Sequence, residues 1–423
     1  MKITRYIVFI IFFMVLLPGC NDASSKNKTV LTYYVYGQAS MLQCWQKICR
    51  SYEKQNPEIK INLRHVPGFN EYFSKILILI ASGTAPDVIF MNSTQIPAFA
   101  NRNALLPLDS LLSKREKKDA FFKEAYELFH YKKHLWALPS DLAIYVLYYN
   151  PTLFDRAGID YPNKSWSWKE LITAARKLTI IKEDNTTRQF GMIRGNPYLW
   201  IWQNGGSIVD DTENPRKCTL NTSSVVEAIK FMRDLEWKYR VIPSFTSKKE
   251  MDAEQMFKTG RVAMIFGGHW WLPSLSKGDL KFKIVMIPRG KYRACYCSGS
   301  GFSILANTKH PNAAKRFVKF LAGAEAQKML ASLNFGFPAR KSIAQSPEFL
   351  NSIPGVDKEA FLESVPYLKR LPQTPYFNQI DALLWRDLEN VWTLRLTPEE
   401  TLAALTHKID KILASKSRGK NAK

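Results

Sequence analysis

Short β-type runs alternate with helical segments in the first part of this 423-residue chain, and this order constrains its fold most. Runs 30–36, 59–66 and 87–91 have the composition of strands. Segments 41–55 and 70–82, which lie between them, have apolar residues at helical spacing. Strands that alternate with helices in this way predict an α/β fold with an open, mostly parallel sheet.

The strand ends indicate where such a fold would bind a ligand. Ligands of open α/β sheets bind at the carboxyl ends of the strands. Tyr36 ends the first predicted strand, Gln38 follows it after a glycine, and Asn92 follows the third. We therefore expect these three side chains to lie beside a cleft.

The later chain repeats the strand and helix signals less regularly. A strand is predicted at 145–149 and another at 262–266, and residues from 346 onwards are predicted to be mainly helical. Helices are further predicted at 168–178, with Ser167 as the cap, and at 225–239, 251–257 and 312–321. The length is too great for one ordinary domain, so two domains or a large bilobal body are expected.

The first twenty residues have the layout of a bacterial secretory signal that ends at a cysteine. Lys2 and Arg5 precede an apolar run at 7–17, and Gly19 precedes Cys20. The run is shorter than the roughly 20 residues that span a bilayer. We predict a signal peptide over 1–19, lipidation of Cys20, and a tether over 20–29. Plain secretion and an uncleaved anchor are the alternatives.

This placement in the cell envelope, outside the cytoplasm, disfavours ATP chemistry and work on nucleic acids. The net charge is +23, but the basic residues are scattered and are not interleaved with aromatic residues, as a strand-binding groove would require. The positive balance is interpreted as a solvated surface near anionic lipid. No nucleic-acid partner is expected.

The cysteines do not have the spacing of a metal site. Cys44, Cys49, Cys218, Cys295 and Cys297 include no CxxC pair, and no histidine lies at zinc-finger spacing from them. Burial as small apolar side chains is the expected role, and one disulfide is the alternative. Neither a metal nor a cofactor is predicted.

Eight segments, in order along the chain, resemble one family. They read ASGTAPDV (81–88), LLPLD (105–109), WALP (136–139), LYYNPTLFDRAG (147–158), SWSWKEL (165–171), NGG (204–206), FKTGRVAM (257–264) and GFPAR (336–340). This series resembles the maltose-binding-like extracellular solute-binding proteins of ABC sugar importers.

The resemblance implies a bilobal periplasmic-binding-protein fold, in which two α/β lobes with open, mostly parallel sheets are joined by a hinge of several strands. It assigns 30–140 with 297–338 to lobe 1 and 141–296 with 339–423 to lobe 2, with crossings near Ser140, Cys297 and Ala339. Such a protein is a monomer that captures a small solute between its lobes, and closure signals to membrane permease subunits.

Sugar recognition needs aromatic faces against the ring and planar polar groups for its hydroxyls. The resemblance places the segment that ends with Trp271 (267–271) at the cleft. One of its two adjacent tryptophans would contact the ligand, and the other would join the core. It also offers Asp141 at the first crossing and backbone amides after Ser298. The ligand-binding candidates are therefore Tyr36, Gln38, Asn92, Asp141, His269 as a hydrogen-bond donor, Trp270, Trp271, Gly299, Ser300 and, with weaker support, Arg340 and Arg370.

The ligand class stays open between two alternatives. The tryptophans favour a neutral sugar, whereas His269 and the arginines would suit glycerol-3-phosphate or another phosphorylated solute. A glycoside-active enzyme is disfavoured because the chain has no HExxH, GxSxG, P-loop or GxGxxG motif, although paired carboxylates leave no such motif. A surface adhesin would predict neither a buried pocket nor ligand-induced closure.

Overall fold

The computed structural model describes residues 28–183, 187–245 and 252–418. The predicted signal peptide (1–19), Cys20 and all but the last two residues of the predicted tether lie outside these ranges. Within them, no helix combines the length and the apolar character that a membrane span requires.

The first sheet contains the three strands predicted from the start of the chain. Its order is β2-β1-β3-β13-β6; β1 pairs with β2 and β3 in parallel, and β13 pairs antiparallel with β3 and β6. Alternate residues Leu31, Tyr33 and Val35 of β1 are buried, as the period of a strand requires. The strands are β1 (Thr29–Tyr36), β2 (Ile59–Val66), β3 (Val88–Asn92), β6 (Leu138–Pro139) and β13 (Ser300–Ile304).

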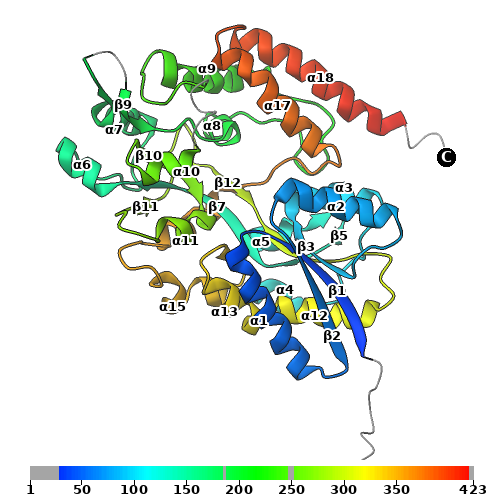
Figure 1. The fold of residues 1–423 in the computed structure, drawn as a ribbon. Coiled ribbons are helices and arrows are strands. Elements are labelled where there is room, and N and C mark those ends of the chain that lie inside the picture. The colour runs from blue at the N-terminus through cyan, green and yellow to red at the C-terminus, as the bar shows by residue number, and fades with distance from the viewer. Residues whose placement is uncertain (1–27, 184–186, 246–251, 419–423) are drawn as a thin grey trace, which may run out of the picture.

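Helices lie against this sheet (Figure 1). On α1 the residues Trp45, Ile48 and Tyr52 recur at helical spacing and are buried. The Trp45 ring meets the edge of Tyr33 in β1, with 5.7 Å between the ring centroids. The helices of this part are α1 (Ala39–Gln55), α2 (Phe69–Ala81), α3 (Ile96–Asn101), α4 (Lys114–Asp119), α5 (Lys123–Glu127), α12 (Pro311–Leu321) and α13 (Ala324–Ala331), with the short helix η1 (Ser93–Gln95) and the hairpin β4 (His130–Tyr131) and β5 (His134–Leu135).

The second sheet is built around the long strand β7. Its order is β15-β12-β7-β10-β9-β8, and β11 and β14 also pair with β7. Its strands are β7 (Asp141–Tyr149), β8 (Ile180–Ile181), β9 (Thr187–Met192), β10 (Val262–Gly268), β11 (Lys283–Val285), β12 (Cys295–Ser298), β14 (Phe337–Pro338) and β15 (Leu368–Lys369).

The α/β fold class is confirmed, but the expectation of a mostly parallel sheet is wrong for this second sheet. Strands β10, β11, β12 and β14 all run antiparallel to β7. The reason is that β7 leads away from the junction of the two sheets, whereas its neighbours return towards it. Parallel pairing is found between β9 and β10 and between β12 and β15.

Helices are present where the sequence predicted them in this part of the chain, at 168–178, 225–239, 251–257 and after 346, together with others that it did not predict. Ser167 caps α7 as expected, because its hydroxyl accepts from the Lys169 N–H and the Glu170 carboxylate accepts from the Ser167 N–H. Helix α8 packs on α9, and α9 and α17 pack on α18. The helices are α6 (Pro151–Ala157), α7 (Trp168–Leu178), α8 (Pro197–Gln203), α9 (Ser223–Trp237), α10 (Ala253–Lys258), η3 (His269–Trp271), α11 (Leu272–Leu275), α14 (Lys341–Ala344), α15 (Pro347–Leu350), α16 (Glu359–Ser364), η4 (Val365–Tyr367), α17 (Phe377–Trp392) and α18 (Pro398–Arg418).

Three chain segments meet where the sheets join. The chain passes from β6 to β7 at Ser140 and from β12 to β13 at Gly299. The Ser140 N–H donates to the Ser300 carbonyl at 2.8 Å, and the Ala339 N–H donates to the Ser140 carbonyl at 3.1 Å. We call this meeting point the junction. The division into lobes at 30–140 with 297–338 and 141–296 with 339–423 is kept as a proposal.

The five cysteines of the described residues are buried and free, as expected for small apolar side chains. Burial raises the pKa of each thiol; the pKa of Cys49, for example, rises to about 12. These thiols are therefore protonated and unreactive at neutral pH.

Gly299 allows the segments at the junction to approach closely. A Cβ atom at Gly299 would lie 2.4 Å from the Asp141 carbonyl oxygen. We predict that Gly299→Ala lowers the free energy of unfolding by about 3 kcal/mol, because backbone must shift to relieve the overlap. Urea denaturation measures this. The control is Gly355→Ala, where nothing lies within 4 Å and only the backbone angle of +76° opposes the change, at about 1 kcal/mol. Equal losses would contradict this account of the junction.

Candidate functional site

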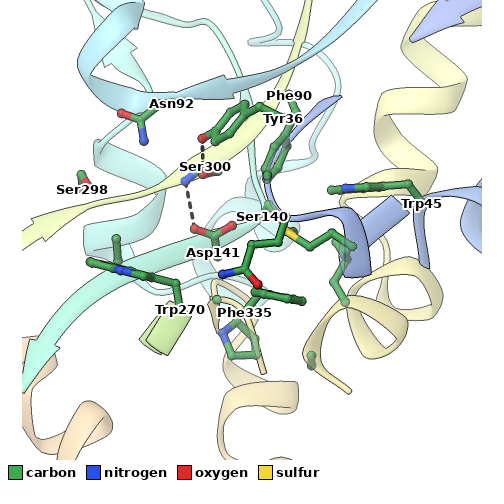
Figure 2. Close-up of a pocket in the computed structure, with 18 of the residues that line it drawn as sticks. Tyr36, Trp45, Phe90, Asn92, Ser140, Asp141, Trp270, Ser298, Ser300 and Phe335 are labelled. Atoms are coloured by element: carbon green, nitrogen blue, oxygen red, sulfur yellow. Dashed lines mark hydrogen bonds between the residues drawn. The ribbon is translucent and has the colours of Figure 1, made fainter. Parts of the chain in front are cut away.

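A cavity of about 390 Å³ lies at the junction, between the two sheets. Six of the candidates from the sequence line it: Tyr36, Gln38, Asn92, Asp141, Trp270 and Ser300. Figure 2 shows Asp141 and Ser300 in the middle of the group, with Tyr36 and Phe90 on one side and Trp270 and Phe335 on the other. Six of the twenty lining residues are aromatic, and we call this the aromatic cavity.

The polar centre of the aromatic cavity comes from the two strands that cross the junction. The Ser300 N–H donates to Asp141 Oδ1 at 3.0 Å, and the Tyr36 and Ser300 hydroxyls form a hydrogen bond of 3.0 Å. Burial raises the pKa of Asp141 to about 7, although hydrogen bonds from the Ser300 N–H and the Ser140 side chain act to lower it. The hydrogen bond from the Ser300 N–H therefore holds the Asp141 carboxyl group in place at the centre of the cavity.

The two tryptophans after β10 take different places, as the sequence suggested. Trp270 lines the aromatic cavity and meets Tyr145 edge to face, with 5.4 Å between the centroids. Trp271 packs on Tyr148 instead, at 6.0 Å. A Cβ atom at Gly268 would lie 1.9 Å from the Trp270 ring, and one at Gly267 would lie 2.0 Å from the Trp271 ring. The glycine pair thus leaves room for both rings to fold back onto the strand.

His269 lies behind the cavity and does not line it. The ring is fully buried, stacks on Phe349 at 5.3 Å, and forms a 2.9 Å hydrogen bond from Nδ1 to the Asn334 carbonyl. Because a carbonyl only accepts, Nδ1 carries the proton. Burial lowers the pKa of His269, and the nearby ammonium of Lys358 lowers it further. His269 therefore donates its hydrogen bond to the protein's own backbone and not into the cavity.

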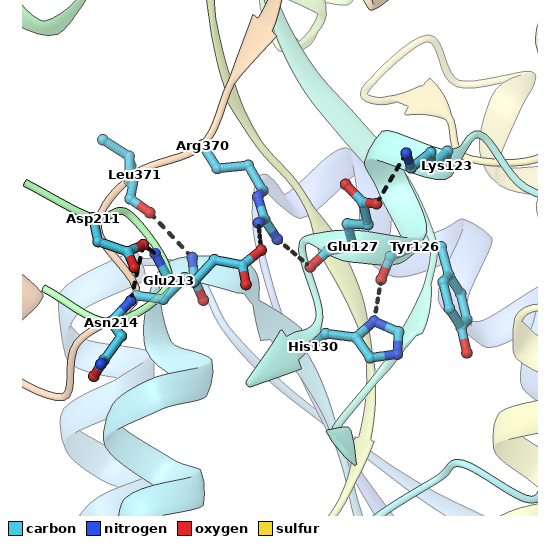
Figure 3. Close-up of polar contacts among 10 residues, drawn as sticks. Lys123, Tyr126, Glu127, His130, Asp211, Glu213, Asn214, Arg370 and Leu371 are labelled. Atoms are coloured by element: carbon cyan, nitrogen blue, oxygen red, sulfur yellow. Dashed lines mark hydrogen bonds and ion pairs between the residues drawn. The ribbon is translucent and has the colours of Figure 1, made fainter. Parts of the chain in front are cut away.

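Gly299 and the two arginines also lie outside the aromatic cavity. The Gly299 N–H donates to Ser93 Oγ. Arg340 Nε donates to the Ala322 carbonyl at 2.6 Å, and its guanidinium lies over the Phe121 ring. Arg370 donates to the Glu127 carbonyl at 3.0 Å and pairs with the Glu213 carboxylate, as Figure 3 shows. Arg370 lines a separate cavity of about 870 Å³.

A polar cavity of about 520 Å³ adjoins the aromatic cavity and shares Phe69, Asn92 and Ser298 with it. Gln95 of η1 and Asn378 of α17 exchange two side-chain hydrogen bonds, of 3.1 and 3.0 Å, beside it. This amide pair joins an element of the first sheet to a helix that packs on α18. The two cavities together form one extended cleft.

Several cleft residues escaped the sequence analysis. Trp45 and Met41 line the aromatic cavity from α1, whereas the sequence predicts them only as part of the helix at 41–55, with its apolar residues at helical spacing. Phe90 and Phe335 line it as well, and Asn378 lines the polar cavity. A stripe at helical spacing does not distinguish a ring at the edge of a cavity from one inside the core. The described residues include no group of three or more His, Cys, Asp or Glu that could hold a metal ion.

Residues 34–328 match the family model described as bacterial extracellular solute-binding protein. This match covers more than half of the chain. The chain belongs to this family. Its members are solute-binding proteins and not enzymes, and the family description places them outside the cytoplasm.

Relatives of this solute-binding protein extend over most of its length. An ABC substrate-binding protein of Listeria monocytogenes, solved in complex with cycloalternan, has a TM-score of 0.82 and 28% identity and covers 92% of this chain and 99% of its own. A maltooligosaccharide ABC transporter solute-binding lipoprotein of Streptococcus pneumoniae is 22% identical over 88% of this chain and 84% of its own. An arabinooligosaccharide-binding protein of Halalkalibacterium halodurans is 23% identical over 66% of this chain and 64% of its own.

Asp141 gives the ligand-free protein a measurable pH dependence. Folded Asp141 holds its proton up to pH about 7, whereas the unfolded residue releases it near pH 4, so stability contributed at low pH is lost as pH rises between these values. Asp141→Asn keeps the acceptor for the Ser300 N–H and removes the titration. We predict that its free energy of unfolding relative to wild type rises by about 4 kcal/mol between pH 4 and pH 7.5. Denaturant titrations at both pH values measure this. The exposed Asp279→Asn is the control, and an unchanged difference for Asp141→Asn would contradict the prediction.

Proposed function

We propose that this protein captures a saccharide between its two lobes and delivers it to the permease of an ABC importer. The observation that carries the proposal is the aromatic cavity at the junction, where Trp270 and Tyr36 flank the carboxyl group of Asp141. The named relatives bind maltooligosaccharide and arabinooligosaccharide, and the Listeria protein was solved with cycloalternan, which supports a saccharide.

The chemistry of the cavity suits a sugar ring. A pyranose presents an apolar face of C–H groups, which aromatic rings cover, and an edge of hydroxyls, which need acceptors. Asp141 and Ser300 supply acceptor atoms at the centre, and Gln38 and Asn92 supply amide groups at the wall. A buried hydroxyl left without a partner costs about 1–3 kcal/mol, so the placement of these groups would select among sugars.

A phosphorylated solute fits the cleft less well. The arginines that favoured it at the level of the sequence are directed elsewhere: Arg340 contacts Ala322 and Phe121, and Arg370 contacts Glu127 and Glu213. A buried phosphate needs cationic or amide donors around it. Among the described residues that line the aromatic cavity, Asp141 is the one with a carboxyl group, which would repel a phosphate when ionised.

We further propose that the protein is a monomer held at the membrane by lipid on Cys20, after removal of residues 1–19. The Streptococcus relative, which is named a lipoprotein, supports this. The anchor would keep the solute-binding lobes beside the permease and outside the cytoplasm. Ligand binding would shift the population from open to closed lobes, as differential affinity for the closed state requires.

The two tryptophans give a matched pair of variants for the binding test. We predict that Trp270→Ala lowers saccharide affinity at least about tenfold with little loss of folding stability, because its ring faces the cavity. Trp271→Ala should instead lower stability by about 3 kcal/mol, because its ring fills the space against Tyr148. A thermal-shift panel of neutral mono- and oligosaccharides and glycerol-3-phosphate, with calorimetry on each hit, measures both. Unchanged affinity in Trp270→Ala, or a response to glycerol-3-phosphate alone, would contradict the proposal.

The lipid anchor is tested separately by fractionation. Cys20→Ala removes the thiol that would carry the lipid, so the protein should leave the membrane fraction and become soluble outside the cytoplasm. Cys44→Ala, on the buried face of α1, is the control that should stay with the membrane. Membrane association of Cys20→Ala would indicate an uncleaved anchor instead.

A further inference from the structure

The cleft differs in charge from the rest of the chain. The chain has 60 lysine and arginine residues against 37 aspartate and glutamate residues. Among the described residues that line the aromatic cavity and the polar cavity, there is no lysine, arginine or histidine, whereas Asp141 and Asp381 contribute a carboxyl group each. The chain as a whole is thus positively charged, whereas the charged side chains among these lining residues are carboxyl groups.

Asp141 has no charge compensation. It forms no ion pair with any side chain of the described residues, and its hydrogen bonds come from a backbone N–H of Ser300 and a neighbouring hydroxyl. Asp381 also has no ion pair among the described residues, but two side chains donate to it: Tyr198 Oη to its Oδ1 at 2.6 Å and Trp385 Nε1 at 3.2 Å. A buried carboxylate without a cation is costly. This cost falls when a positive group binds beside it.

Aromatic rings surround this carboxyl group on several sides. The rings of the aromatic cavity are Tyr36, Trp45, Phe69, Phe90, Trp270 and Phe335. Figure 2 shows Tyr36 and Phe90 above Asp141 and Trp270 and Phe335 below it. The face of an aromatic ring attracts a cation, most strongly when water is excluded. Rings around a carboxylate therefore form a site for an organic cation, and the same rings cover the C–H face of a sugar.

Resting on the proposed function, we propose that the solute is an amino sugar, whose protonated amine faces Asp141 while its ring packs against Trp270. An anionic sugar would meet two carboxyl groups and no cationic side chain in this cleft. A neutral sugar would give the Asp141 carboxyl group no cationic partner. The amine satisfies the carboxylate with a charge-assisted hydrogen bond, which is about twice as strong as a neutral one.

The experiment compares sugars that differ only at one substituent. Calorimetry at pH 7 on the full-length protein uses glucosamine, galactosamine, mannosamine and the glucosamine disaccharide from chitosan. Each is compared with its N-acetyl counterpart and with the parent sugar that has a hydroxyl at that position. The amine of at least one set should bind at least about tenfold more tightly than both uncharged forms.

Variants then assign the preference to Asp141. Asp141→Asn should reduce the preference for the amine about tenfold, since it keeps the shape and removes the charge. Asp279→Asn, which removes the same charge from an exposed position, should retain it. Equal or tighter binding of an uncharged sugar by the wild type would overturn this inference and leave the proposed function intact. Binding of no saccharide from any set would overturn both.

Discussion

The hydrogen-bonded junction at Ser140 and Asp141 is the constraint on which the rest of the structure depends. The Ser140 carbonyl accepts a hydrogen bond from the Ala339 N–H, and the Ser140 N–H donates to the Ser300 carbonyl. The Asp141 side chain in turn accepts from the Ser300 N–H. Because three segments from distant parts of the chain share these bonds, both sheets end at the same place. The aromatic cavity forms there.

The same junction explains why an acidic side chain is buried beside aromatic rings. Asp141 is the first residue of β7, so its position is fixed by the strand and not by its own solvation. Burial at that point raises its pKa to about 7. A charge placed at some cost in the ligand-free protein is a means of selecting a ligand, because the ligand that restores the lost interactions recovers that free energy. The large buried cluster of aromatic and aliphatic side chains stabilises the fold that imposes this position.

The sequence predicted those features that follow from local periodicity. The strands at β1, β2 and β3 and the helices between them have apolar residues at the spacing of their own elements, and the fold class follows from their order. The sequence predicted that one of the two adjacent tryptophans would line the pocket, but it did not predict which one. That depends on how the rings of Trp270 and Trp271 pack against the preceding glycines, which the structure shows. Trp45 and the Gln95–Asn378 pair escaped prediction because they depend on the packing of segments far apart in the chain. The arginines lie outside the aromatic cavity for the same reason, because their contacts also depend on segments far apart in the chain. Arg370, for example, contacts Glu127 and Glu213.

The central claim is that a saccharide binds in the aromatic cavity at the junction. A crystal structure of the protein with a saccharide that stabilises it would test this most directly. The account predicts a sugar ring in contact with the face of Trp270 and a polar atom of the sugar within hydrogen-bond distance of an Asp141 oxygen, with the ligand extending towards the polar cavity beside Asn378. A saccharide bound elsewhere, such as in the cavity that Arg370 lines, with the aromatic cavity filled only by water, would contradict it.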